Sequence, residues 1–379
     1  MSLPPLSNAT KQALLKLGIT YPIIQAPMAG VSTPLLAATI TNNGGLGSLG
    51  LGASNHLIAE KMIIDTQKLI NIKNGKFNVN LFVHSKPNFD STINSKWLNQ
   101  LKPEFEKYKT ELPKELKIIY KSFEEDENML KILLKLKPPI ISFHFGLPSF
   151  EILYKLKEIG SILMITVTNL KEALEVQNKG GNGLIDFIIV QGYEAGGHRG
   201  IFNPNENDEK LSTFKLCKLI LNEKKINIPI ISTGGIMNGK LIKKYLNLGC
   251  SAVQLGTTFI GCKESSIDKG YKEFLFNIEK SKKTIMTKFI SGRPARTIEN
   301  KFTDLEIQLR LQNVDVRLPD YPITYDAGKA LHNAAKQFDE YGYGAYWAGE
   351  NAPLARKLDA KEMLETLVKE WKDAERDTN

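Results

Sequence analysis

The residues most able to do chemistry lie in the segment QGYEAGGHRG, which spans positions 191–200. His198 follows two glycines, Gly196 and Gly197, shortly after an apolar run. Because glycine carries no Cβ, this backbone can lie flat against a planar ring while the histidine enters the same pocket. Imidazole has an unperturbed pKa of about 6.5, so it can accept a substrate α-proton or hold an anion as imidazolium. We predict that His198 is catalytic; the alternative is a histidine that only caps a loop.

Glycines also follow two later apolar runs, in the segments STGGI and QLGTTF. Glycine lets backbone N–H groups approach an anion closely, and the start of a following helix adds a favourable dipole. Either segment alone could be an ordinary tight turn. Together they predict a phosphate site, and hence a phosphorylated cofactor, at Gly234, Gly235, Gly256 and Thr257.

Amide side chains recur at or near the ends of these apolar runs. A flavin needs such uncharged partners for the edge of its ring and for its ribityl hydroxyls, although amides could equally be polar caps of the fold. The first run ends in QAPMAG, a rigid and soft apolar surface for a ring, and Met28 could also be a core residue. The cofactor residues predicted from these segments are Gln25, Ala26, Pro27, Met28, Ala29, Asn80, Gln191 and Gln254.

Eight short apolar runs position these residues, with helical patterns between them. Runs such as IISFHF and ILMITVT are apolar nearly throughout, as expected of parallel strands that are covered on both sides. Eight such units predict an α/β fold, a (β/α)8 TIM barrel, with the chemistry at the C-terminal ends of the strands. The runs are 23–27, 45–49, 77–83, 140–145, 163–168, 187–191, 228–233 and 252–256.

The domain organisation follows from the segments that break this repeat. We predict a cofactor-binding barrel over 1–263, with a lysine- and glutamate-rich helical insertion at about 85–137. The pattern over 264–354 is helical and irregular, and it predicts a second, smaller, mainly helical domain on the substrate side. Apolar residues from Met363 to Trp371 share one helical face, so we expect 355–379 to be a helix that packs back on the barrel.

Composition and charge exclude several classes of protein. The net charge of +9 comes from lysines scattered among apolar residues, which disfavours nucleic-acid binding. Three cysteines without CxxC spacing argue against a disulfide framework or a structural zinc site. No stretch approaches the roughly 18 apolar residues of a membrane span, and the N-terminus lacks a secretory pattern. We therefore expect a cytoplasmic enzyme without metal, membrane or nucleic-acid partners.

The motifs resemble those of the nitronate monooxygenases, formerly called 2-nitropropane dioxygenases. The similarity spans nearly the whole chain, although EAGGH is shared with the flavin-dependent enoyl reductases of fatty acid synthesis. The resemblance implies one noncovalent FMN, with its phosphate at the two glycine loops and its ring near 27–29, and His198 as the catalytic histidine. The segments that carry it are QAPMAG, NGGLGSLG, FNVNLFV, QGYEAGGHRG, STGGI, SGRPAR and YWAGE.

The same resemblance implies the reaction. Members oxidise alkyl nitronates, including propionate 3-nitronate, with molecular oxygen to a carbonyl compound and nitrite, without nicotinamide or metal. A nitronate is already a stabilised carbanion, so it can give an electron directly to an oxidised flavin. We expect a role in detoxifying nitronates, with the small-molecule nitronate and O2 as partners and a monomer or homodimer as the assembly.

The resemblance also suggests a substrate wall from the appended domain. Tyr321, Tyr325 and Lys329 stand four residues apart, so a helix would place two phenols and an ammonium on one face, a clamp for a nitro group or carboxylate. Half-buried packing is the alternative for the tyrosines. His144, at the end of the fourth run, is a further substrate candidate.

Two other functions remain open at this point. One is an FMN-dependent reductase of the same barrel type that takes hydride from NAD(P)H to a quinone or an enoyl thioester. The other is a noncatalytic phosphate-binding barrel, which would need no histidine beside a glycine pair.

Overall fold

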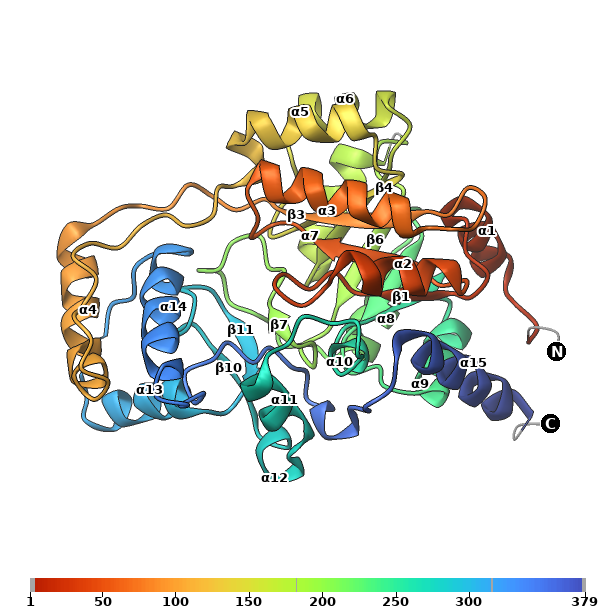
Figure 1. Cartoon of the computed structure of the whole chain (residues 1–379). Helices are drawn as coiled ribbons and strands as arrows, with labels where there is room; N and C mark the ends of the chain where they lie inside the picture. Colours follow the sequence, from red (N-terminus) through yellow and green to blue (C-terminus); the bar gives the residue numbers. More distant parts are fainter. Residues whose placement is uncertain (1–3, 182, 315, 377–379) are drawn as a thin grey trace.

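The structure is a computed structural model that describes residues 4–181, 183–314 and 316–376. Eight parallel strands form a barrel (Figure 1), in the spatial order β1, β9, β8, β6, β5, β4, β3, β2. A parallel bridge between Ile24 and Leu46 joins the two ends of this order. The prediction of a (β/α)8 barrel is confirmed. Its strands are β1 (Ile23–Gln25), β2 (Gly47–Gly50), β3 (Phe77–Phe82), β4 (Ile140–His144), β5 (Ile162–Val167), β6 (Phe187–Gln191), β8 (Ile230–Thr233) and β9 (Ala252–Leu255).

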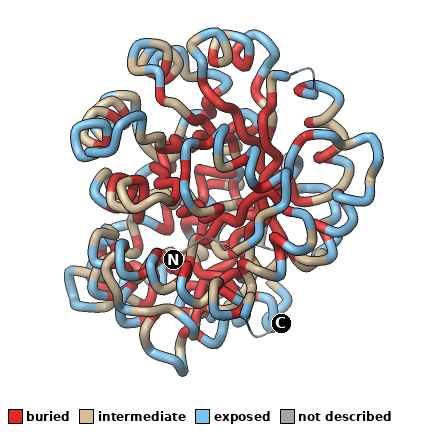
Figure 2. The backbone as a smooth tube through the Cα atoms, turned by 90° about the vertical axis from the view of Figure 1, so that its right-hand side faces the viewer, coloured by how far each residue is buried: buried red, intermediate tan, exposed pale blue. Residues whose placement is uncertain are grey.

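Both faces of the barrel strands are buried, which explains why the strands read as apolar runs. Along β6, Phe187 and Ile189 belong to one apolar cluster, which also contains residues of α1 (Asn8–Leu17). Their neighbours Ile188 and Val190 belong to a second cluster, shared with the surrounding helices. Figure 2 shows the buried backbone concentrated in the centre of the molecule and the exposed backbone around it.

Helices cover the outside of the barrel between its strands. The last helix, α15 (Ala360–Arg376), packs against α9 and α2 and buries the face that runs from Met363 to Trp371. No helix in the described part of the chain is long and apolar enough to cross a membrane. The other covering helices are α2 (Pro34–Asn42), α3 (His56–Leu69), α5 (Glu127–Leu136), α6 (Phe150–Glu158), α7 (Leu170–Gly180), α8 (Thr213–Leu221) and α9 (Gly239–Leu248).

The segment between β3 and β4 divides between two parts of the molecule. Its first helix, α4 (Ser91–Glu106), packs against α14 (Ile323–Lys336), away from the barrel (Figure 1). Its second, α5, packs against α3 and α6 in the barrel's outer layer. Trp97 of α4 meets Phe289 edge-on, at 5.1 Å between ring centroids, within a separate apolar cluster. The insertion therefore contributes to the layer above the strand ends, whereas the proposed domain limits at 263 and 354 remain a prediction.

A three-stranded antiparallel sheet is the element that the sequence did not predict. Its order is β10 (Thr284–Thr287), β11 (Ala295–Ile298) and β7 (Gly197–His198). Strand β7 pairs only two residues with β11, too few to leave a periodic pattern in the sequence. This sheet fixes the position of the predicted catalytic histidine. The remaining elements are α10 (Thr257–Ile260), α11 (Lys269–Phe276), α12 (Ile278–Ser281), α13 (Lys301–Leu311), η1 (Phe123–Glu125) and η2 (Ala352–Leu354).

Candidate active site

A cavity of about 350 Å³ lies at the C-terminal ends of the barrel strands. The structure brings all but one of the predicted site residues to its walls. The predicted residues that line the cavity are Ala26, Pro27, Met28, Ala29, Asn80, His144, Gln191, Gly196, Gly197, His198, Gly234, Gly235, Gln254, Gly256, Thr257, Tyr321, Tyr325 and Lys329.

Gln25 is the predicted site residue that does not reach the cavity. Its side chain is fully buried, and its amide nitrogen donates to Ser32 Oγ at 3.0 Å. Its amide oxygen accepts from the backbone N–H of Ser48 at 2.8 Å. Gln25 therefore ties the end of β1 to β2 and holds the 26–32 loop that lines the cavity.

The two glycine loops present unpaired backbone donors. Gly234 and Gly235 have φ values of +123° and +68°, which side chains rarely adopt, so glycine is required there. The backbone N–H groups of Gly234, Gly235, Gly256 and Thr257 donate to no acceptor within the described residues. Asn351 fixes one loop by donating to Gly235 O at 2.6 Å. An anion such as a phosphate could accept from these groups.

The predicted amides divide into two kinds. Gln191 braces the loop that carries the histidine: its amide nitrogen donates to His198 O at 3.0 Å, and its oxygen accepts from Gly200 N at 2.8 Å. Asn80 donates to Ser142 Oγ at 2.9 Å. Gln254, in contrast, keeps its side-chain oxygen buried and without a partner among the described residues, so it is the amide most available to a bound group.

Gly196 and Gly197 are required for different structural reasons. The sequence analysis expected both glycines to let the backbone lie against a planar ring, but Gly196 faces another chain segment. A Cβ on Gly196 would lie 2.4 Å from Gly349 N, so this glycine admits the backbone of the YWAGE segment. Gly197 has a φ of +74°, and only Trp347 Cβ lies near its missing side chain, at 3.8 Å. Gly196 thus allows two chain segments to approach, and Gly197 turns the chain into β7.

His198 is held in an aromatic surround. Its ring centroid lies 4.9 Å from that of Trp347, 5.5 Å from that of Tyr321 and 5.6 Å from that of Phe145. Burial, followed by the influence of His144 and Arg293, lowers the pKa of His198 to about 3. The imidazole is therefore neutral at physiological pH and is not a preformed imidazolium.

His144 supports the same loop from β4. Its Nε2 lies 3.1 Å from His198 O, and because a carbonyl only accepts, Nε2 carries the proton. Burial lowers the pKa of His144 to about 4, so this ring is neutral as well. Two neutral imidazoles thus face the cavity, and a buried cation lies close enough to influence both.

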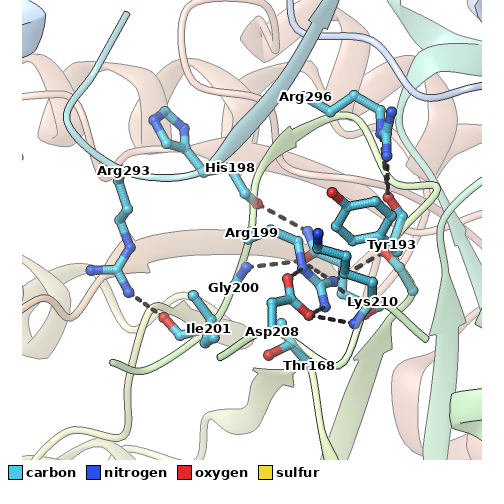
Figure 3. Close-up of polar contacts among 12 residues, drawn as sticks. Thr168, Tyr193, His198, Arg199, Gly200, Ile201, Asp208, Lys210, Arg293 and Arg296 are labelled. Carbon is cyan, nitrogen blue, oxygen red and sulfur yellow. Dashed lines mark hydrogen bonds and ion pairs between the residues drawn. The ribbon is translucent and has the colours of Figure 1, made fainter. Parts of the chain in front are cut away.

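That cation is Arg293, which is buried and has no carboxylate partner among the described residues. Its guanidinium lies 4.1 Å from the centroid of Phe145 and donates to the backbone oxygens of Ile201 and Phe202. In Figure 3 the His198 ring points away from the ion pair between Arg199 and Asp208, with Arg293 on its other side. The positive field near the two histidines favours an anionic ligand.

The opposite wall consists of phenols and one ammonium. Lys329 Nζ lies 5.3 Å from the ring centroid of Tyr325 and 5.0 Å from that of Tyr120. Burial raises the pKa of both phenols to about 12, so they remain hydrogen-bond donors. The hydroxyl of Tyr321 is buried with no partner in the described chain. These groups can donate to a nitro group or a carboxylate.

Several lining residues escaped the sequence analysis because no local pattern marks them. Tyr120 comes from the insertion, in a stretch without regular structure, and at the cavity its ring meets that of Tyr325 edge-on, at 5.9 Å between centroids. Trp347 belongs to the YWAGE motif, which was noted but given no role. Trp347 forms an isolated antiparallel bridge with Thr297 of β11 and lies beside Gly197, contacts between segments far apart in the sequence.

Comparisons with known proteins identify the family. The nitronate monooxygenase family model matches residues 11–370. The nitronate monooxygenase of Paraburkholderia phytofirmans is 48% identical over 368 residues, which cover 96% of each chain. That of Pseudomonas aeruginosa is 42% identical over 354 residues, covering 93% of this chain and 97% of the relative.

Solved structures agree with this result. A nitroalkane oxidase from Streptomyces ansochromogenes superposes with a TM-score of 0.82 at 30% identity, covering 97% of this chain and 100% of the other. FabK from Thermotoga maritima superposes with a TM-score of 0.70 at 24% identity, over 97% of each chain, which shows a shared fold alone.

The fold and the site define an oxidoreductase of the (β/α)8-barrel class. The matches extend over almost the full length of both this chain and its relatives. The chain belongs to the nitronate monooxygenase family, whose members are flavoproteins, and it is an enzyme with nitronate monooxygenase activity. The resemblance seen in the sequence is thereby confirmed.

Proposed function

We propose that this enzyme uses one noncovalent FMN and molecular oxygen to convert alkyl nitronates such as propionate 3-nitronate to a carbonyl compound and nitrite. The observation that carries this proposal is the pairing of two cavity walls. One offers unpaired backbone N–H groups at Gly234, Gly235, Gly256 and Thr257, and the other offers neutral phenols with Lys329. The first suits a cofactor phosphate, and the second suits a small organic anion.

The residues present fit FMN. The buried, unpartnered oxygen of Gln254 suits a donor on the cofactor. A Cβ on Gly256 would have only ordinary contacts, at 3.6 Å to Ala26 and 4.0 Å to Met28, so the absence of a side chain there leaves room on the cavity side. Pro27 to Ala29 supply an apolar surface for a ring. Bound FMN would supply the electron acceptor for the nitronate and pass electrons to oxygen.

The chain's own residues would orient the substrate and move its proton. Neutral His198 can accept the α-proton of a nitroalkane, or donate a hydrogen bond to an anion once protonated. Tyr321 and Tyr325 would donate to the substrate's oxygens, and Lys329 would attract its charge. The aromatic surround of His198 would exclude water from the reacting carbon.

The proposal includes a role in detoxifying nitronates in the cytoplasm, by a monomer or homodimer. The rival reductase of the same barrel type is supported by the fold alone, since the likeness to FabK lies below 25% identity. A noncatalytic phosphate-binding barrel would not need two histidines, His198 and His144, at one cavity.

Anaerobic mixing tests the proposal. The purified enzyme is mixed with propionate 3-nitronate, and separately with NADH and NADPH, while the flavin spectrum is recorded. We expect rapid loss of the oxidised flavin spectrum with the nitronate and none with the nicotinamides. Fast reduction by NADPH with no response to the nitronate would support the reductase instead, and a colourless protein that does not bind added FMN would support the binding module.

A further inference from the structure

The SGRPAR segment, residues 291–296, begins directly behind His198 with a serine. Ser291 is fully buried, and its Oγ lies 2.9 Å from His198 Nε2. Gly292 adopts a φ of +86°, which turns the chain so that the serine reaches the ring. Ser291 is thus the hydrogen-bond partner of the His198 imidazole, through Nε2.

The direction of this hydrogen bond follows from the neighbours of Ser291. The hydroxyl donates to Arg293 O at 3.1 Å, and Arg293 N donates to the same Oγ at 3.4 Å. A carbonyl oxygen only accepts, and Arg293 O has no other donor within the described residues. The serine proton is therefore committed to Arg293 O, so Oγ accepts from His198 and Nε2 must carry a proton.

We propose that Ser291 is a positioning residue that holds His198 as the Nε2–H tautomer, so that Nδ1 is the basic atom presented to the substrate cavity. This inference rests on the proposed function for its chemical meaning. In that role the α-carbon–hydrogen bond of a nitroalkane breaks, the proton passes to Nδ1, and the electron pair moves onto the nitro group to give the nitronate.

The surroundings of Nδ1 agree with this role. Nδ1 makes no hydrogen bond in the described chain, and it is not among the side-chain atoms sealed from solvent, unlike Nε2 of His84. The His198 ring could adopt two orientations that differ by a 180° rotation about its Cβ–Cγ bond. Its contacts with the rings of Trp347 and Tyr321 would be similar in both. Within the described part of the chain, the hydrogen bond to Ser291 distinguishes the orientations, because a turned ring would place a carbon atom against its Oγ.

Nitrogen NMR of histidine side chains measures the tautomer directly. The FMN-loaded enzyme is labelled with ¹⁵N-histidine, and His198 is assigned by comparison with H198N. We expect one protonated nitrogen, Nε2, and one unprotonated nitrogen, Nδ1, at neutral pH. A wild-type signal with the proton on Nδ1 would overturn the inference, whatever the activity of the enzyme.

Variants then separate positioning from general support of the fold. S291A should show a mixture of tautomers and lose about fivefold to tenfold in kcat on a neutral nitroalkane, as expected for one hydrogen bond. The KM for preformed propionate 3-nitronate should change by less than about twofold, because that substrate has already lost its proton. S291T keeps the hydroxyl and should restore both the tautomer and the rate.

S281A is the matched control, because Ser281 is equally buried but its hydroxyl has no partner in the described chain. It should leave the His198 signal unchanged. If S291A keeps a single Nε2–H tautomer, the inference fails even when nitronate oxidation is intact. If the tautomer is as expected but the enzyme does not oxidise nitronates, the proposed function fails and the inference about Ser291 stands.

Discussion

The two walls of the cavity are built in different ways. The barrel wall consists of strand ends, whose backbone donors and small residues come directly after the apolar runs that form β8 and β9. The other wall consists of large side chains from segments far apart in the sequence. For example, Lys329 Nζ in α14 lies 5.0 Å from the ring centroid of Tyr120, which precedes η1. The wall proposed for the cofactor therefore depends on local backbone geometry, whereas the wall proposed for the substrate depends on tertiary packing.

His198 lies where the two walls meet, and its replacement should have the largest effect. In H198N the activity on a neutral nitroalkane should fall by about two to four orders of magnitude, the usual contribution of a general base. Oxidation of preformed nitronate should fall much less, because its carbon has already lost the proton. Steady-state rates on both substrates, in protein with measured flavin content, check this.

H332N is the control for this change, because His332 lies on α14 and does not line the cavity. It should retain both activities. Equal losses on nitroalkane and nitronate in H198N, with flavin retained, would mean that His198 binds the anion and is not the base. Full activity on both would place the active site elsewhere.

The barrel wall is tested by adding volume at Gly256. Its φ of −101° suits any residue, and a Cβ meets no protein atom closer than 3.6 Å, so G256V should fold normally. Its branches would enter the cavity, and overpacking of about 1 to 3 kcal/mol predicts FMN binding weaker by roughly fivefold to 150-fold. Titration of apoprotein with FMN measures this, and denaturant unfolding checks the fold. Unchanged FMN affinity would remove the β9 loop from the cofactor site.

The substrate wall is tested by K329M. Lys329 is exposed, so solvent screening should hold the effect on propionate 3-nitronate to about threefold to tenfold in KM. K336M is a suitable control, since Lys336 lies on the same helix but pairs with Asp268 at 2.7 Å outside the cavity. A KM equal to that of the wild type would exclude Lys329 from the site.

The sequence could predict which residues of the barrel wall reach the cavity because they lie near or directly after the C-terminal ends of strands. Gly234 and Gly235 are required by their positive φ values, and such local requirements are visible in one chain. Gln25 does not reach the cavity, although Ala26 does, because successive side chains along a strand point in opposite directions and that of Gln25 points into the core. The environment of His198 could not be foreseen, since β7 is two residues long and its partner β11 lies almost a hundred residues further on.

The smallest expected effect concerns pH. Burial, His144 and Arg293 lower the pKa of His198 to about 3, so in the free enzyme the ring stays neutral as the pH falls through the usual histidine range. The kcat/KM for preformed nitronate reports the free enzyme, and it should be flat between about pH 6 and about pH 8. A loss of activity centred near the ordinary histidine pKa would show that a protonatable histidine controls binding.

The separation of the two walls is tested most directly by the FMN dissociation constant of the H198N/K329M apoprotein. Lys329 belongs to the substrate wall and His198 lies where the two walls meet, whereas FMN is proposed to bind through the backbone groups of the barrel wall. We therefore expect a dissociation constant within about twofold of the wild-type value, as for independent sites. A loss of affinity of about tenfold or more would contradict the account, because it would show that the residues assigned to the substrate also hold the cofactor.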